Sequence, residues 1–236
     1  MFGIVMATYY RKNNKTKNYL NRSINSIINQ TFSDWQLIIV GDKYEPEEEL
    51  LEIINEFKQK TSNKIIYLKN LVVERDFIKD KNKLWNVAGA TSINIGLNYL
   101  RDNNIKYYCH LDDDDYWNEK HLSALNEIYS KYENCVFSNT QSKYINTFLP
   151  KTNNFVIKEN NLLPQERIMV HSSYSFRCDI IKFNYYTIFT EDSYFYPSDA
   201  IMLNNIQKFI LENKQYCAIY NPVLTCYHEI EGEAKK

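Results

Sequence analysis

The stretch YYCHLDDDDYW, residues 107–117, places four consecutive aspartates directly after a short apolar and aromatic segment. Residues 107–111 are predicted to form a buried strand, because a short run of apolar and aromatic residues favours that structure. Asp112–Asp115 would then lie at the carboxyl end of the strand, where open α/β sheets form their ligand crevice. Clustered carboxylates repel one another. Tyr116 and Trp117 also argue against a simple solvated turn, so we favour a site for a divalent cation with oxygen ligands.

Strand-like and helical segments alternate on the N-terminal side of this stretch and shortly after it. Predicted strands cover residues 2–8, 35–40 and 64–68, and predicted helices cover 16–30, a segment starting near Pro46, 90–101 and a segment capped by Asn118. This alternation is typical of a mostly parallel sheet with helices on both faces. The second half is less regular, with predicted strands over 135–138, 218–220 and 223–227, a helix over Ser198–Glu212, and a loop over 147–163.

The composition excludes several classes of function. The chain has 236 residues, a formal net charge of -1 and 44% hydrophobic residues, which is an ordinary globular balance. A net charge near zero argues against nucleic acid as the main partner, because phosphate neutralisation requires a basic face. Only 5 glycines are present, and they form neither a P-loop nor a G-x-G-x-x-G motif. A bound nucleotide diphosphate would therefore need another source of positive charge, and a divalent metal is the obvious one.

The cysteines and the apolar runs indicate the cellular compartment of the protein. The 5 cysteines lie far apart and contain no C-x-x-C pair, so free thiols are expected rather than a disulfide framework or a zinc site. No apolar run approaches the ~20 residues of a membrane span, and the first residues are predicted as a strand rather than a signal peptide. We therefore predict a cytoplasmic protein. The abundance of Lys, Asn and Ile is typical of an A/T-rich genome, and for a large virus the location would be the host cytoplasm.

Several segments carry a resemblance to a known family. Residues 5–11 read VMATYYR, residues 31–35 read TFSDW, residues 38–42 read IIVGD, and residues 111–117 read LDDDDYW. In this order and at this spacing they resemble the family 2 glycosyltransferases, which have the GT-A fold, and the last segment is similar to the family's D-x-D motif. Residues 86–96, NVAGATSINIG, resemble a further family motif but place Ile93 where an arginine is usual.

The resemblance implies an α/β fold of the GT-A type. Its central sheet would be Rossmann-like and mostly parallel, flanked by helices, with a smaller mixed region on the acceptor side. We expect a single domain over residues 1–236, with a nucleotide-sugar-binding half over residues 1–117 and an acceptor-binding half over residues 118–236.

The resemblance also implies a donor site assembled from several segments. Asp42 would accept a hydrogen bond from the edge of the base, as expected for uracil, and Arg11 would lie near the phosphates. Asp114 would ligate Mn²⁺ or Mg²⁺, and His228, in a late Tyr-His pair that resembles a family motif, would be a second metal ligand. The full set implied to contact the nucleotide sugar is Ala7, Thr8, Tyr10, Arg11, Asp42, Asn86, Asp112 and Asp113.

The catalytic base is expected in the second half of the chain. The family has a Glu-Asp pair at the start of a helix, and Ser198-Asp199 opens a predicted helix in a comparable place, so Asp199 is the predicted base. Asp192 competes, because it follows Glu191 in a literal Glu-Asp pair, although a poorer helix follows it. A simpler explanation of Asp199 is charge complementarity with the helix dipole, worth under ~1 kcal/mol.

Other residues beside these motifs have weaker support. His110 and His171 match no motif and are expected to be structural. Phe176-Arg177 resembles a family segment near the acceptor site. Tyr9 and Trp117 lie beside candidate sites, where their rings could stack on a base or a sugar.

These expectations combine into one hypothesis of function. The protein would be a metal-dependent, inverting glycosyltransferase that moves a sugar from a nucleotide diphosphosugar, with a UDP-sugar favoured, to a hydroxyl of a glycan or other acceptor. One alternative is a non-catalytic nucleotide-sugar-binding protein, suggested by the departures at Ile93 and Ser198. The other is a nucleotidyltransferase of related topology, which is disfavoured because the loop at residues 9–13 contains no glycine.

Overall fold

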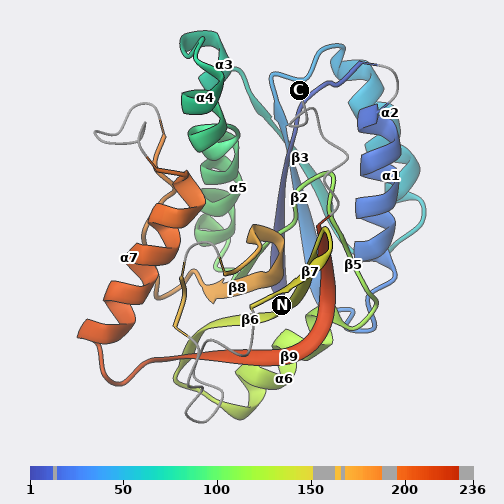
Figure 1. Cartoon of the computed structure of the whole chain (residues 1–236). Helices are drawn as coiled ribbons and strands as arrows, with labels where there is room; N and C mark the ends of the chain where they lie inside the picture. The colour runs from blue at the N-terminus through green and yellow to red at the C-terminus, as the bar shows by residue number, and fades with distance from the viewer. Residues whose placement is uncertain (13–14, 151–162, 166–167, 188–195, 229–236) are drawn as a thin grey trace.

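The structure, a computed structural model, describes residues 1–12, 15–150, 163–165, 168–187 and 196–228. Its centre is one nine-stranded sheet with the order β3-β2-β1-β4-β8-β6-β9-β5, and β7 pairs with β6 outside this path. Figure 1 shows helices on both faces of the N-terminal part of the sheet.

The first four long strands form the parallel part of the sheet. They are β1 (Phe2–Thr8), β2 (Trp35–Asp42), β3 (Ile65–Asn70) and β4 (Tyr107–His110). Side chains of β1 and β2 alternate between two hydrophobic cores, because successive residues of a strand point to opposite faces. Ile4 and Met6 pack in one core with α1 (Lys15–Ile28) and α2 (Glu47–Lys58). Val5 packs in the other with α5 (Ala90–Asp102) and α7 (Ser198–Glu212).

The later strands form the mixed part of the sheet. They are β5 (Tyr116–Trp117), β6 (Cys135–Tyr144), β7 (Thr147–Leu149), β8 (Tyr174–Arg177) and β9 (Cys217–His228). Strand β8 runs antiparallel to both β4 and β6, whereas β6 and β9 are parallel. Helix α6 (His121–Lys131) packs against β6 and β9. This arrangement agrees with the predicted parallel sheet and smaller mixed region.

Several predicted boundaries were wrong. The two short strands predicted near the C-terminus are one strand, β9, which continues through Pro222 with register shifts against β6. The predicted loop begins with β7 and continues into residues that the structure does not describe. Asn118 does not cap α6: that helix begins three residues later, and the Asn118 side chain instead accepts from Lys120 N and donates to Leu224 O.

The connection between β3 and α5 contains two helices that the sequence did not predict. They are α3 (Glu74–Phe77) and α4 (Lys81–Val87). Both are short, and α3 buries one residue of its four, so neither shows the apolar stripe that identifies a helix in sequence. Figure 1 shows them beside the N-terminal end of α5.

The Phe176-Arg177 segment lies away from the carboxyl end of β4. Phe176 is fully buried in the core. Arg177 pairs in register with Tyr107, the first residue of β4, and binds Asp179. Because β8 runs antiparallel to β4, this arginine is at the opposite end of the strand from Asp112.

The five cysteines are all free thiols, as expected, and four of them are buried. Within the described ranges, no helix combines the length and the apolarity needed to cross a bilayer.

Helix α5 approaches β1 closely because two glycines lie at the contact. A Cβ at position 96 would lie 2.5 Å from Cγ1 of Val5, and one at position 3 would collide with the Leu100 side chain. The close approach packs the middle and the C-terminal part of α5 against the first half of β1.

We expect Gly96→Ala to lower the free energy of unfolding by up to about 2 kcal/mol. Overpacking against Val5 should outweigh the gain in helix propensity, which is roughly 1 kcal/mol. Urea unfolding of the variant and of Asn98→Ala, an exposed position on the same helix, measures the difference. The control should match or slightly exceed the wild type, and a Gly96→Ala protein as stable as the wild type would contradict the packing described.

Candidate donor and catalytic site

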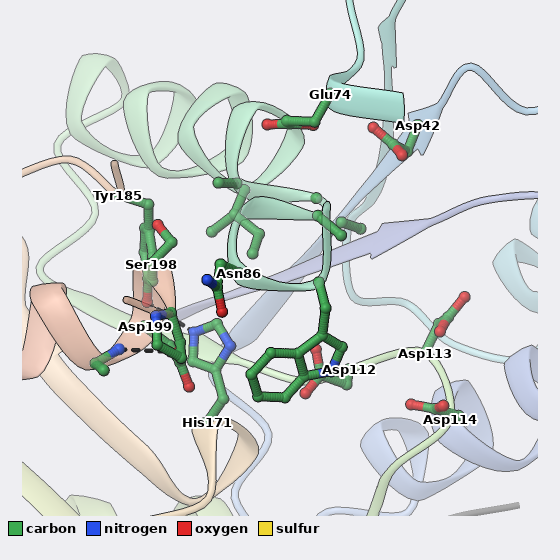
Figure 2. Close-up of a pocket in the computed structure, with 18 of the residues that line it drawn as sticks. Asp42, Glu74, Asn86, Asp112, Asp113, Asp114, His171, Tyr185, Ser198 and Asp199 are labelled. Atoms are coloured by element: carbon green, nitrogen blue, oxygen red, sulfur yellow. Dashed lines mark hydrogen bonds between the residues drawn. The ribbon is translucent and has the colours of Figure 1, made fainter. Parts of the chain in front are cut away.

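A cavity of about 1030 Å³ opens where β1, β2 and β4 end. The walls come from these strand ends, from α3 and α4, from the start of α5, from the start of α7 and from the end of β9. Figure 2 shows Asp42 and Glu74 in one part of the cavity, Asp113 and Asp114 in a second, and Asp199 beside His171 in a third. The carboxyl ends of parallel strands meet at one sheet edge, which explains why distant motifs converge here.

Most of the predicted site residues line this cavity. They are Ala7, Thr8, Arg11, Asp42, Asn86, Asp112, Asp113, Asp114, Asp199 and His228. Tyr10 does not line it: its ring packs edge-on against Tyr44 with centroids 5.8 Å apart, and the neighbouring Tyr9 lies in the wall instead. Asp192, the competing base, lies outside the residues that the structure describes.

Asp113 is held by residues of the N-terminal loop. It accepts a hydrogen bond of 2.6 Å from Thr8 Oγ1 and a pair of 2.6 and 2.8 Å from the two terminal nitrogens of Arg11. The guanidinium carbon of Arg11 also lies 4.1 Å from the centroid of the Tyr9 ring. A bidentate pair of this kind fixes both partners, so Arg11 positions Asp113.

Asp115 turns away from the cavity and orients His228. Its carboxylate is buried and accepts from His228 Nδ1 at 2.8 Å. Burial would lower the pKa of His228, but the hydrogen bond and charge of Asp115 raise that pKa to about 9. A carboxylate on one imidazole nitrogen leaves Nε2 for a ligand, which is the usual support of a metal-binding histidine.

Asp114 is the carboxylate that most needs a cation. Burial and, after it, the charges of Asp113, Asp112 and Asp115 together raise its pKa to about 7. A divalent ion would remove this repulsion. The residues present therefore fit a hard divalent cation, which Asp114 and His228 would hold.

Asp199 lies in the first turn of α7, where its Oδ1 accepts from Ala200 N at 2.9 Å. Burial raises the pKa of this carboxyl, and the charge of Asp112 raises it further. The preceding residue, Ser198, donates to Tyr186 O at 2.6 Å. A partly buried carboxylate with increased proton affinity is suited to accept a proton.

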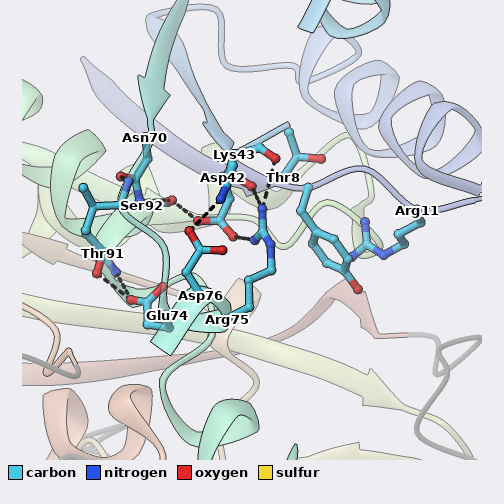
Figure 3. Close-up of polar contacts among 12 residues, drawn as sticks. Thr8, Arg11, Asp42, Lys43, Asn70, Glu74, Arg75, Asp76, Thr91 and Ser92 are labelled. Atoms are coloured by element: carbon cyan, nitrogen blue, oxygen red, sulfur yellow. Dashed lines mark hydrogen bonds and ion pairs between the residues drawn. The ribbon is translucent and has the colours of Figure 1, made fainter. Parts of the chain in front are cut away.

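Asp42 lies in a polar network that the sequence did not predict (Figure 3). Arg75 of α3 contacts both its side chain and its backbone oxygen, and Ser92 of α5 donates to it at 2.5 Å. Glu74 joins the same two helices, because its Oε1 accepts from the backbone and hydroxyl of Thr91 at 2.7 and 2.5 Å. Arg75 and Glu74 were missed because no motif or periodicity marks α3.

His110 and His171 were expected to be structural. His171 lines the cavity, and the buried His110 contacts Asp112, which also lines it. His110 Nε2 is 2.8 Å from Asp112 Oδ1, and its ring stacks on that of His171 with centroids 3.8 Å apart. Burial, together with the charge of His110, lowers the pKa of His171 well below its usual value. Trp117, by contrast, is buried and donates from Nε1 to Ser172 O, so its ring belongs to the core.

The fold is shared with solved glycosyltransferase structures. One is that of S. aureus TarS residues 1–349 in complex with UDP-GlcNAc, with a TM-score of 0.69 and 14% sequence identity over 98% of this chain. Another is the mannosyltransferase PcManGT from Pyrobaculum calidifontis in complex with GDP-Man and Mn²⁺, with a TM-score of 0.65 and 12% identity over 98% of this chain. The chain spans 59% and 57% of these two structures. The architecture is therefore GT-A, as predicted.

Sequence comparison narrows the class to one family. The chain is 46% identical over 241 residues to uncharacterized glycosyltransferase R139 of Acanthamoeba polyphaga mimivirus, a match that covers 99% of this chain and 96% of that protein. It is 39% identical over 97 residues to uncharacterized glycosyltransferase MJ1057 of Methanocaldococcus jannaschii, which covers 40% of this chain and 30% of that protein. The profile of glycosyl transferase family 2 matches residues 3–187. The chain belongs to this family, which confirms the resemblance, and it is a glycosyltransferase.

We expect Mn²⁺ to bind more weakly at acid pH. Asp114, with a pKa of about 7, and His228, with a pKa of about 9, must lose protons before they can ligate the ion. Between about pH 8 and pH 6 the affinity should fall about tenfold or more, with proton release on binding. Calorimetry in two buffers of different ionisation enthalpy measures both quantities.

The control for this titration is Asp114→Asn, which should lose most of the affinity at either pH. An affinity for Mn²⁺ that is equal at the two pH values would contradict the site described.

Proposed function

We propose that the protein is a metal-dependent, inverting glycosyltransferase that transfers a sugar from a nucleotide diphosphosugar, with a UDP-sugar as the favoured donor, to a hydroxyl of a glycan. One observation carries the proposal. A single cavity holds a carboxylate cluster that needs a cation, around Asp114, and a separate carboxylate with raised proton affinity, Asp199. Transfer of a sugar from a diphosphate requires both a cation for the leaving group and a base for the acceptor.

The proposal assigns the two halves of the chain to the two substrates. Residues 1–117 supply the strand ends and loops around Asp42 and Asp113, and would bind the donor. Residues 118–236 supply α7, η2 (His171–Ser173) and the end of β9, and would bind the acceptor. Both halves contribute side chains to the same cavity, so donor and acceptor would meet within it.

The nucleobase would lie against Asp42, Arg75 and Tyr9. Uracil presents one N–H between two carbonyl oxygens, so Asp42 can accept from the N–H while an N–H of Arg75 donates to a flanking carbonyl. The Tyr9 ring in the wall offers a face on which a base can stack. Guanine also presents an N–H beside a carbonyl, so GDP-sugars are the competing donor class.

The transfer would proceed in one displacement. Asp199 accepts the proton of the acceptor hydroxyl, and the resulting oxygen attacks the anomeric carbon from the face opposite the diphosphate. The bond from that carbon to the phosphate oxygen breaks as the new bond forms, which inverts the configuration. When bound, a divalent ion on Asp114 and His228 supplies charge neutralisation for the leaving diphosphate.

We also propose that the enzyme acts in the cytoplasm, which for a viral source is that of the host. The support is the set of five free thiols, since reduced cysteines are typical of reducing compartments.

The role of Asp199 predicts a separation of binding from transfer. Asp199→Asn keeps the shape of the side chain but removes its ability to accept a proton, so transfer should fall by a factor of at least about 100 while donor affinity stays within about twofold. Single-turnover transfer assays and equilibrium binding of the donor measure the two quantities.

The matched control is Asp192→Asn, which makes the same substitution at the competing position. It should retain transfer. Loss of transfer in Asp192→Asn, with activity retained in Asp199→Asn, would reassign the base.

The donor class is testable by ligand-induced stabilisation. We expect UDP with Mn²⁺ to raise the melting temperature more than GDP, CDP or ADP with Mn²⁺, and expect little effect of UDP without the metal. If GDP with Mn²⁺ is the only one of the four nucleotides that raises the melting temperature, the donor is a GDP-sugar and not a UDP-sugar. No shift with any nucleotide would argue against nucleotide-sugar transfer by this cavity.

A further inference from the structure

A second group of metal-type ligands lies at the cavity wall, where Asp112 and His171 line the cavity and the buried His110 contacts Asp112. It consists of His110, Asp112 and His171, whose candidate ligand atoms all lie within 4.8 Å of one another. His110 ends β4, Asp112 follows two residues later, and His171 belongs to η2, more than fifty residues further along the chain. The fold, rather than a local motif, brings the three together.

The chemistry of this group differs from that around Asp114. Two imidazoles and one carboxylate form a donor set that suits Zn²⁺ and related transition ions, which are bound by nitrogen at about 2.0–2.1 Å. Mg²⁺ and Mn²⁺ favour oxygen ligands. The cavity therefore contains an oxygen-rich group at Asp114 and a nitrogen-rich group at His110 and His171.

The contacts among the three residues are those of a site that can exchange a proton for an ion. His110 Nε2 and Asp112 Oδ1 are 2.8 Å apart and share a hydrogen bond. An ion between them would replace the bridging proton with a small increase in separation. His110 Nδ1 is buried and has no hydrogen-bond partner among the residues that the structure describes.

One rearrangement is needed. The rings of His110 and His171 stack with an interplanar angle of 12°, and an imidazole binds an ion in its own plane, so one ring must turn. His171 is the ring that can turn, because it lines the cavity whereas His110 is 1% exposed. Turning releases Tyr185 Oη, which is 2.8 Å from His171 Nε2 but keeps Tyr108 and Tyr174 as partners at 3.1 and 3.3 Å.

We propose that His110, Asp112 and His171 form a second metal site, distinct from that of Asp114, which binds Zn²⁺ or a similar transition ion with an open fourth position. Asp199 lines the same cavity, and Figure 2 shows it on the same side as His171, so the charge of the bound ion would lower the proton affinity of this carboxylate. Zn²⁺ would thereby weaken the group that accepts the proton, and would inhibit transfer. The inhibition, unlike the binding, rests on the proposed role of Asp199.

Cobalt spectroscopy tests the site directly. Co²⁺ is the probe, because nitrogen ligation in a four-coordinate site gives it strong visible absorption. We expect that absorption in the wild type, in Asp114→Asn and in His228→Ala, and we expect its loss in His171→Ala. Zn²⁺ affinity, measured by competition with a chromophoric chelator, should fall at least about tenfold in His171→Ala.

Two controls separate the site from folding and from the other metal. Mn²⁺ binding by His171→Ala should equal that of the wild type, which shows that the variant is folded and that the Asp114 group is intact. His171→Gln, which keeps a polar group for Tyr185, should lose Co²⁺ in the same way. The matched substitution His228→Ala removes the other cavity histidine and should retain the Co²⁺ spectrum.

The outcomes distinguish this site from the proposed function. If His228→Ala loses the Co²⁺ absorption and His171→Ala keeps it, or if Zn²⁺ affinity is unchanged in His171→Ala, the second site is overturned. If Co²⁺ and Zn²⁺ behave as expected but no nucleotide sugar is turned over, the metal site stands and the proposed function fails. In an active enzyme, Zn²⁺ should inhibit the wild type and leave His171→Ala much less affected.

Discussion

Repulsion among four adjacent carboxylates is the constraint on which the site depends. Like charges at this spacing persist only where each has a different compensation. Asp113 binds Arg11, Asp115 binds His228 and Asp112 binds His110, and these three cations or imidazoles come from three separate segments of the chain. Asp114 keeps a raised pKa of about 7. The contacts of Arg11 and His228 therefore also fix two walls of the cavity relative to β4.

The fold could be predicted where hydrophobic pattern alone decides the structure. The apolar run that became β1 and the stripe that became α5 were placed almost to the residue. Prediction failed where tertiary contacts decide instead. Helices α3 and α4 have too few buried residues for a stripe. Strand β9 continues through Pro222, because register shifts against β6 accommodate that residue.

The candidate site, like the fold, could be predicted from the sequence only in part. Residues in segments that end parallel strands, such as Asp42 and Asp112, line one cavity because the topology sends all such ends to one edge. Their partners could not be predicted. Arg75 comes from the unpredicted α3, His171 from η2, and the choice of Tyr9 over Tyr10 depends on the direction of one side chain. Hydrogen-bond partners over such sequence separations have no local signal.

The short strand β5 has a consequence for how this enzyme could diversify. It follows the aspartates immediately and pairs with β9 at Tyr116–Tyr227, so the adjacent His228 is delivered to Asp115 by strand register. A slip of one residue would turn that histidine to the opposite face. Strand β6 pairs with the other edge of β9, with Tyr144 opposite His228, and the rings of these two residues stack with centroids 4.8 Å apart. The histidine is therefore fixed from both edges of β9, so an insertion between β5 and β9 keeps it in place only where the β6 pairing stays intact.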